Sequence, residues 1–127
     1  MQTFTFRYSP NEPSIGKKMR DAVHGKPHVR PNELISTELK DLLRIASESR
    51  LSLFAAILEK KPNSIYELAE MLNKSQPYVL KEVRVLESLG LIKLHRESES
   101  GRERLRPEAL YSNIVIDCGF SSSREAS

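Results

Sequence analysis

Hydrophobic and polar residues alternate in two short segments near the ends of the chain. Thr3–Tyr8 reads Thr-Phe-Thr-Phe-Arg-Tyr, and this period of two predicts a half-buried β-strand. Ile114–Cys118 predicts a further short strand. Proline and glycine residues follow the first strand as far as Pro31, so this stretch predicts a loop with at most a short helix over Lys17–Val23. The last residues, 119–127, are predicted to be disordered.

In the middle of the chain the hydrophobic residues recur with the period of an α-helix instead. A stripe of leucines predicts one helix over Asn32–Ala46. The next stripe predicts a helix over Glu48–Lys61, and Ser47 stands where an N-cap residue is expected. Pro62 follows this helix and ends it, because proline cannot continue the hydrogen-bonded backbone.

Two shorter segments then predict helices separated by a tight turn. Ser64 and Glu67 have the S-x-x-E spacing of a capping box, which opens the first helix. After the dipeptide Asn-Lys, Ser75 caps the second helix. Pro77 lies in its first turn, where the missing N–H costs no hydrogen bond. This helix runs to about Leu89 and stops at the glycine that follows.

A charged β-hairpin is predicted after these helices. Leu91–His95 and Arg102–Arg106 are its strands, and the polar residues Glu97–Gly101 form the turn between them. The two strands near the chain ends have no such neighbour in the sequence. Because isolated strands leave backbone groups without partners, we expect them to pair with each other, within one chain or across a dimer.

Three short capped helices followed by a hairpin are the element order of a winged helix-turn-helix. We therefore predict an α+β fold: a winged helix-turn-helix with an added N-terminal strand and helix and a C-terminal strand. In the third helix of the motif, Val79, Val83 and Leu86 share one face, which packs against the two preceding helices. The other face presents amide, phenol and cationic groups to solvent, from Gln76, Tyr78, Lys81 and Arg84.

These side chains are suited to contacts with double-stranded DNA. Gln76 and Lys81 can read base edges in the major groove, and the hydroxyl of Ser75 can receive a phosphate at the helix N-terminus. Arginines alternate along the second hairpin strand, so they share one face and can follow a phosphate backbone or enter a minor groove. The predicted DNA-binding residues are Ser75, Gln76, Tyr78, Lys81, Arg84, Arg102, Arg104 and Arg106.

The charge of the chain points to nucleic acid only through its distribution. Twenty Lys and Arg residues against seventeen Asp and Glu give a formal net charge of +3, too small an excess to indicate such a partner by itself. The positive charge is concentrated in Lys17–Arg30 and in Leu72–Pro107. The second of these segments contains the predicted recognition helix and hairpin.

Other classes of protein are disfavoured. A chain of 127 residues has the length of one domain, and its single cysteine, Cys118, cannot form a disulfide within the chain. We find no signal-peptide pattern and no apolar run long enough to cross a bilayer, so we expect a cytoplasmic protein without a membrane partner. His24 and His28 have metal-ligand spacing, but the glycine and proline between them preclude a helix. We predict no metal site, no cofactor and no catalytic site, and hence no enzyme.

The central helices also resemble a known family. The segment SIYELAEMLNKSQPYVLKEVRVLESLGLI resembles the helix-turn-helix core of bacterial winged-helix regulators. With LISTELKDLLRIASESRLSLFAAILEKKP before it and ALYSNIVIDCGF after it, the chain is similar to short prokaryotic proteins described as predicted transcriptional regulators, some of them encoded beside toxin-like genes. The resemblance covers Phe4–Ile116, and its specific part is Leu39–Ile92. It implies dimeric, sequence-specific DNA binding through the third helix and the wing. Pro77 and a longer, glutamate-containing wing depart from the family pattern.

The expectation from the sequence is a homodimeric, sequence-specific transcriptional regulator, a repressor that can act on its own gene. Residues 1–31 would form a strand and a basic loop for dimerisation or partner contact, 32–118 the DNA-binding domain, and 119–127 the tail. The alternative is a protein-interaction module such as an antitoxin, in which the basic loop or an apolar groove binds an acidic, toxin-like partner. Salt separates the two, because only phosphate contacts weaken steeply as salt rises.

Overall fold

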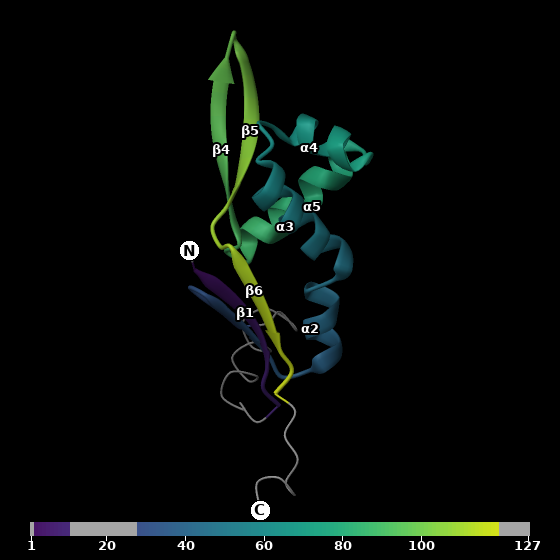
Figure 1. Cartoon of the computed structure of the whole chain (residues 1–127), viewed down its shortest axis with the longest axis vertical. Helices are drawn as coiled ribbons and strands as arrows, with labels where there is room; N and C mark the ends of the chain where they lie inside the picture. The colour runs from purple at the N-terminus through teal and green to yellow at the C-terminus, as the bar shows by residue number, and fades with distance from the viewer. Residues whose placement is uncertain (1, 11–27, 120–127) are drawn as a thin grey trace, which may run out of the picture. The chain divides into compact units, whose positions relative to one another are not determined.

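The computed structural model describes residues 2–10 and 28–119 (Figure 1). Within these residues the protein is an α+β structure with four helices and two sheets. The predicted helix over Lys17–Val23 and the predicted disordered residues 120–127 lie outside the described residues.

The chain divides into two compact units, each of which is described by itself. The first unit is Ser47–Asn113 with the residues up to Thr3, and it contains three helices and a two-stranded sheet. The second is Phe4–Ala46 with the residues from Ile114 onward, and its described part contains a four-stranded sheet and one helix.

A serine caps each helix of the first unit, as the sequence predicts. The hydroxyl of Ser64 accepts a hydrogen bond from the backbone N–H three residues on, at 3.0 Å, and Ser47 and Ser75 do the same at 3.3 Å. The capping box is confirmed in one half only, because Glu67 accepts from the backbone N–H of Asn63 rather than of Ser64. The helices are α3 (Glu48–Lys60), α4 (Ile65–Leu72) and α5 (Gln76–Ser88).

Residues in the left-handed backbone region follow these helices. Lys61 after α3 has a φ of 47°, Asn73 after α4 has 55°, and Gly90 shortly after α5 has 85°. Glycine adopts this conformation without a steric cost, and asparagine tolerates it better than most residues. Gly90 therefore ends α5 as predicted, whereas the helix predicted to reach Lys61 ends one residue earlier.

The hairpin is longer than the sequence predicts. β4 (Ile92–Glu99) and β5 (Arg102–Ala109) pair antiparallel over their whole length. The turn is only Ser100 and Gly101, with φ values of 54° and 80° that suit a two-residue hairpin connection. The predicted turn Glu97–Gly101 is therefore wrong. Residues of opposite charge face each other across the strands and favour pairing where the polar composition suggests a loop.

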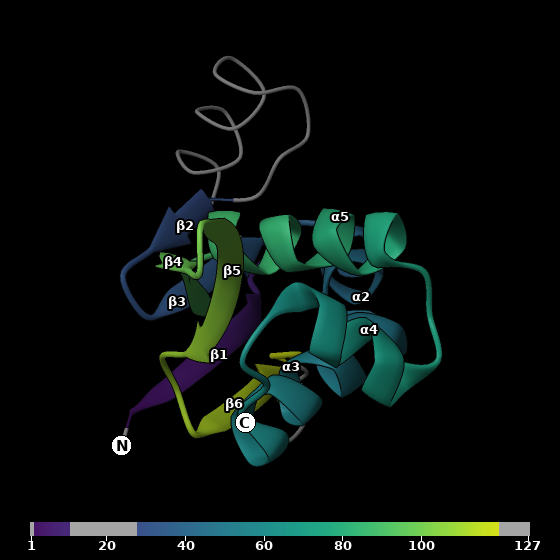
Figure 2. The same ribbon diagram turned by 90° about the horizontal axis from the view of Figure 1, so that it is seen from above.

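Hydrophobic side chains of the three helices and the hairpin form the core of the first unit. Ile57 of α3, Leu68 of α4 and Leu86 of α5 are each at most 1% exposed, and Ile92 at the start of β4 is 2% exposed. The first two helices contact β5, and α5 contacts β4. Seen from above, the helices gather on one side of β5 (Figure 2).

The sheet of the second unit has the strand order β2-β3-β1-β6. β1 is parallel to β3, and β2 is antiparallel to β3. β1 and β6 run in the same direction, because Asn113 bonds to Thr3 at one end and Asp117 to Arg7 at the other. The predicted pairing of the two terminal strands is confirmed, and it occurs within one chain. The strands are β1 (Thr3–Tyr8), β2 (His28–Arg30), β3 (Glu33–Ser36) and β6 (Asn113–Asp117).

One face of this sheet carries the core of the second unit. Phe4 and Phe6 of β1 are at most 1% exposed, and their rings meet edge to face with centroids 5.1 Å apart. Leu34 of β3 and Leu42 of α2 (Leu39–Ile45) are also fully buried, and α2 packs on β3. The short helix therefore covers the phenylalanine face.

The predicted helix over Asn32–Ala46 is wrong in its first part. Glu33–Ser36 is the strand β3, and the helix begins only at Leu39. The leucines fit a helical stripe, but Leu34 also fits a strand. Backbone pairing on both sides, with β1 and with β2, decides for the strand. The short strand β2 beside it has no counterpart among the sequence predictions.

We expect Phe6→Ala to lower the free energy of unfolding by about 3–5 kcal/mol, because a large aromatic side chain is removed from a fully buried position. Thr5→Ala, on the opposite face of the same strand, is the matched control and should cost much less. Urea denaturation followed by circular dichroism measures both. Equal losses for the two variants would contradict the assignment of the core face.

Candidate nucleic-acid interface

A short turn connects α4 to α5 and sets the direction of the second helix. Asn73 takes up the left-handed conformation, and the backbone N–H of Lys74 donates to the carbonyl of Ala69 at 3.0 Å. This hydrogen bond satisfies one of the last carbonyl groups of α4. Ser75 then caps α5 at once, so three residues separate the two helices.

The two faces of α5 differ sharply in burial. Val79 and Val83 are fully buried and Leu86 is 1% exposed, so the predicted packing face is confirmed. Tyr78 is 40% exposed. The other predicted contact residues of this helix, Gln76, Lys81 and Arg84, are exposed as well.

Glu82 lies on the buried side of α5 although it is charged. It is 9% exposed, and its Oε1 accepts a hydrogen bond from Nε of Arg50 in α3 at 2.9 Å. Glu82 shares the face of Val79 and Val83, and its carboxylate is directed toward Arg50 of α3 instead of toward Lys81 and Arg84. Lys81 and Arg84 therefore share an exposed face on which Glu87 is the acidic residue of α5.

The sequence prediction omits a basic residue next to this face. Lys74 precedes the capping serine, and its Nζ lies 5.8 Å from the centroid of the Tyr78 ring, within the range of a cation–π contact. The contact places another cation beside the N-terminus of α5. Its position in the turn, directly before an N-cap, is the signal that could have identified it.

Ser75 combines a structural role with the predicted one. Its Oγ accepts the backbone N–H of Tyr78, which caps the helix. A serine hydroxyl has one hydrogen to donate and two lone pairs, so capping leaves the O–H available to an anion. The first backbone N–H groups of a helix favour negative charge in the same place.

The three hairpin arginines lie on one face of β5, as their alternation predicts. The register places Arg102 opposite Glu99, Arg104 opposite Glu97 and Arg106 opposite His95. The arginines thus face a strand that also carries acidic residues. Arg96 and Glu103 form a separate ion pair.

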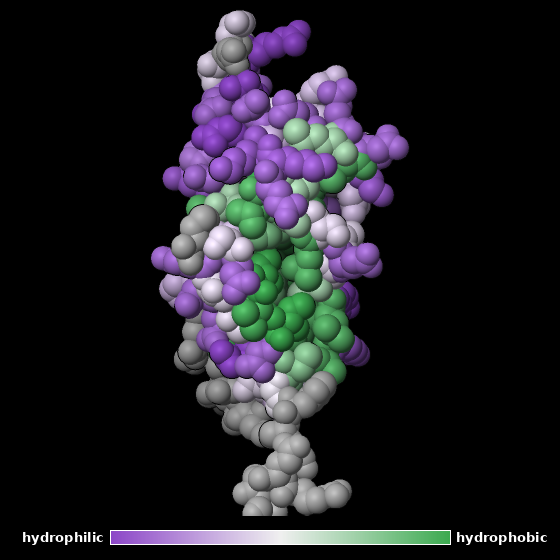
Figure 3. Space-filling model, viewed as in Figure 1, coloured by the Kyte–Doolittle hydropathy of each residue, from purple (hydrophilic) through white to green (hydrophobic). Residues whose placement is uncertain are grey.

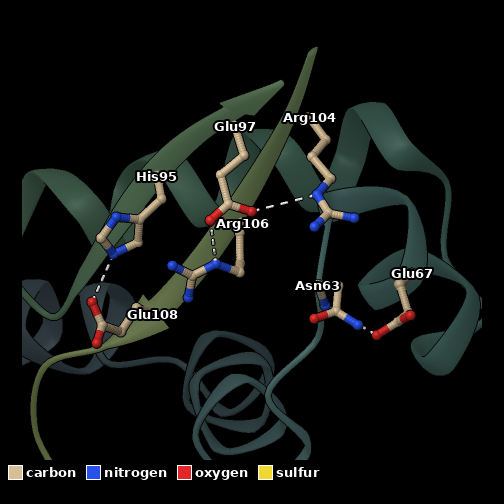
Figure 4. A network of polar contacts seen from close by, with 7 residues as sticks. All are labelled: Asn63, Glu67, His95, Glu97, Arg104, Arg106 and Glu108. Atoms are coloured by element: carbon tan, nitrogen blue, oxygen red, sulfur yellow. Dashed lines mark hydrogen bonds and ion pairs between the residues drawn. The ribbon is translucent and has the colours of Figure 1, made fainter. Parts of the chain in front are cut away.

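Glu97 lies between two of these arginines, as Figure 4 shows. Its Oε2 accepts from Nε of Arg106 at 2.9 Å, and its Oε1 lies 3.4 Å from Nε of Arg104. The hydrogen bond from Arg106, followed by the attraction of both guanidinium groups, lowers the pKa of Glu97. Glu97 therefore stays charged, and it holds both arginines, until the pH falls well into the acid range.

A second carboxylate on this hairpin is held in a similar way. Oε1 of Glu108 lies 2.7 Å from Nε2 of His95, and this hydrogen bond lowers the pKa of Glu108 (Figure 4). Arg102 is exposed near the turn and takes part in none of the ion pairs found among the described side chains. Of the three predicted arginines, Arg102 is the one whose charge Glu97 and Glu108 leave uncompensated.

The hairpin and the start of α5 lie next to each other. A groove lies between the start of α4, the first turns of α5 and the middle of β5, and it is lined by Ser64, Ile65, Tyr66, Gln76, Pro77, Leu80, Glu103, Arg104 and Leu105. Two of the predicted contact residues, Gln76 and Arg104, therefore border the same surface. The structure thus brings the first turn of α5 and the middle of β5 to one surface.

The model of the HVO_A0114 family matches residues 45–116, which is more than half of the chain. The chain belongs to the HVO_A0114 family. The function of this family is unknown. The matched HVO_A0114 region contains α3, α4, α5 and the hairpin, and thus all eight predicted DNA-binding residues. No curated protein matches the chain.

The part of the chain that the structure describes contains neither a membrane-spanning helix nor a cluster of metal ligands. None of its helices is long and apolar enough to cross a membrane. Its His, Cys, Asp and Glu side chains form no group of three or more that could hold a metal ion. His24, which the sequence pairs with His28, lies outside this part.

We expect Arg50→Met to lower the free energy of unfolding by about 1–3 kcal/mol, because it leaves the nearly buried Glu82 carboxylate without its cation. Arg84→Met, which removes an exposed arginine from α5, should change stability by no more than about 0.5 kcal/mol. Urea titrations give both values. The ion pair would lose its structural importance if Arg50→Met were as mild as the control, or if adding Glu82→Leu did not restore stability.

Proposed function

We propose that this protein is a sequence-specific transcriptional regulator that binds double-stranded DNA through a winged helix-turn-helix. In this proposal α4 and α5 are the helix-turn-helix, α5 is the recognition helix, and the β4–β5 hairpin is the wing. The observation that carries the proposal is the exposure on α5 of an amide, a phenol and two cations, while the carboxylate of Glu82 lies on the buried side in an ion pair with α3.

The chemistry of this face suits the major groove. A glutamine amide can donate to and accept from an adenine edge, and a lysine can donate to guanine O6 and N7. Gln76 lies at the first position of α5 and Lys81 lies about one and a half turns further on. The N-terminal turns of a recognition helix are the part that contacts base edges. Ser75 and the adjacent backbone N–H groups supply a phosphate site at the same end.

In this proposal the positive charges of the wing contact the phosphate backbone of the duplex. Arg102 is exposed near the hairpin turn, and Arg104 and Arg106 share its face. A DNA phosphate offers these guanidinium groups the same kind of acceptor that Glu97 provides in the absence of DNA. The wing therefore binds phosphate in competition with its own carboxylate.

Occupancy of an operator is the regulatory step in this proposal. A homodimer would place two recognition helices in successive major grooves of a near-palindromic site, with the wings on the flanking backbone. Such a complex blocks access to a promoter. A site upstream of the protein's own gene would make the repression autoregulatory.

The decisive experiment is a fluorescence-anisotropy titration with DNA from the region upstream of the gene and with a scrambled duplex, at two salt concentrations. Tighter binding to the upstream duplex, weakened by salt, is the expected result. Equal and weak binding to both duplexes would refute sequence-specific binding. It would favour the alternative of a protein-interaction module with a toxin-like partner, which a pull-down would then identify.

Replacing both cations of the recognition face, Lys81→Ala with Arg84→Ala, should weaken operator binding by roughly tenfold or more, since side chains at such contacts contribute about 1–3 kcal/mol each. The matched control is Lys40→Ala with Lys60→Ala, which removes two exposed lysines from α2 and α3. Both doubles lower the net charge equally, so only the first should lose specific affinity in the anisotropy assay. Unchanged affinity in the first double would refute the role of α5.

Gln76→Ala should mainly relax base preference.

Glu97→Gln should strengthen DNA binding a few-fold and make it more salt-dependent, because it frees Arg104 and Arg106 for phosphate. Glu59→Gln is the control, since it removes the same charge from an exposed position on α3. Titrations at several salt concentrations compare the two slopes. If both variants gained equally, net charge rather than the release of these arginines would explain the effect.

A further inference from the structure

The strand β6 leaves an apolar edge of the four-stranded sheet open. Within the described residues its neighbour in the sheet is β1, so β6 is the last strand on its side. Val115 and Ile116 are 41% and 39% exposed, and Leu43 of α2 in the same unit is 48% exposed. Figure 3 shows hydrophobic side chains gathered over β6 and α2.

Such an edge is unusual for a strand that faces only water. Edge strands present a row of unpaired N–H and C=O groups, and proteins commonly protect them with lysine, proline or a bulge. The central residues of β6, Ile114 to Ile116, are all β-branched and apolar, with neither charge nor proline. This composition favours pairing with another strand, and the three residues include no lysine or proline that would prevent it.

The residues of β6 are arranged symmetrically about Val115. In order they are Asn, Ile, Val, Ile and Asp. If a second copy of β6 lies antiparallel with the two Val115 residues opposite each other, each Ile114 faces an Ile116. Each Asn113 faces an Asp117, whose carboxylate can accept from the asparagine amide. The strand is thus complementary to an inverted copy of itself.

We propose that β6 is the interface of a homodimer, in which two sheets join edge to edge in this register into one sheet of eight strands. The two-fold axis passes between the Val115 residues, perpendicular to the sheet. Paired in this way, the same surface is used by both copies, as a closed two-fold dimer requires. The occupant of the edge is therefore a second copy of this chain.

Both faces of the sheet fit this arrangement. Asn113 and Asp117 bond to Thr3 and Arg7, so the odd-numbered residues of β6 lie on the polar face of β1. Ile114 and Ile116 then lie on the phenylalanine face, which α2 covers. A two-fold axis perpendicular to the sheet keeps both α2 helices on this same face. The joined strands continue the apolar face from one copy to the other, with each Ile116 beside the partner's Ile114 on that face.

A charge-swap experiment tests the register. Because Val115 is its own partner, Val115→Lys and Val115→Glu each place like charges opposite one another, and each should weaken dimerisation roughly tenfold or more. An equal mixture of the two variants places opposite charges together and should restore the dimer. Val115→Thr, which stays β-branched and uncharged, is the control and should dimerise like the unaltered chain. Sedimentation velocity at tens of micromolar, without DNA, measures all four.

Three results would overturn the proposal: a monomeric unaltered chain, a Val115→Lys variant as dimeric as the unaltered chain, or a mixture that stays monomeric. Should the charged variants fail to fold, cysteine cross-linking replaces them. Directly opposed residues in an antiparallel pair have Cα atoms about 4.5–5.5 Å apart, within disulfide range. In a Cys118→Ser background, Val115→Cys should therefore form a covalent dimer under mild oxidation, and Ser98→Cys in the hairpin should not. Failure of Val115→Cys to cross-link selectively would contradict the register.

This inference rests on the homodimer that the proposed function invokes, and its sedimentation experiment contains no DNA, so the two can fail separately. A monomer that binds its operator would refute the β6 interface and the two-fold mode of operator binding, but not DNA contact through α5. A dimer through β6 that binds no DNA specifically would do the reverse.

Discussion

The burial of one row of side chains on α5 is the constraint on which the candidate site depends. Val79, Val83 and Leu86 lie one turn apart and fill the space against the neighbouring helices, so the rotation of α5 about its axis is fixed. That rotation decides which groups face water. Gln76, Lys81 and Arg84 are exposed because the valines and the leucine are not. The turn at Asn73 and the serine cap fix the other end of the same helix.

Charge in this protein is arranged as much by folding as by composition. The net charge of +3 is small, and acidic residues are interspersed with basic ones along α5 and the hairpin. Two of these carboxylates, those of Glu82 and Glu97, have different surroundings in the folded protein. Glu82 pairs with Arg50 on the buried side of α5, whereas Glu97 lies at the hairpin surface, where it pairs with two arginines and offsets one of their two charges. The exposed cations of α5 are therefore not paired with Glu82, whereas Arg104 and Arg106 of the hairpin are held by Glu97.

In the second unit, the strands near the two ends of the sequence belong to the same sheet. β1 lies between β3 and β6, so residues from both ends of the sequence complete one sheet. The ion pairs of Arg7 with Glu33 and with Asp117 join the strands on one face, and the phenylalanines join them to α2 on the other. The sheet that results has a charged face, an apolar face and one apolar edge. These properties follow from the pairing of distant segments, and none belongs to a single strand.

The sequence by itself determined the features of this HVO_A0114 family chain that depend on neighbouring residues. Serine caps, the proline in the first turn of α5, the alternation of β1 and the apolar stripe of α5 are local, and each was confirmed. Non-local contacts decided the rest. Leu34 suits a helix or a strand equally, and only pairing with β1 and β2 made Glu33–Ser36 a strand. The polar residues of the hairpin suggest a turn until their cross-strand partners are known. Glu82 follows Val79 by three residues and so shares its face of α5, but its partner Arg50 lies 32 residues away in the chain. That partner could not be read from the sequence, because an ion pair between two helices exists only after those helices have packed.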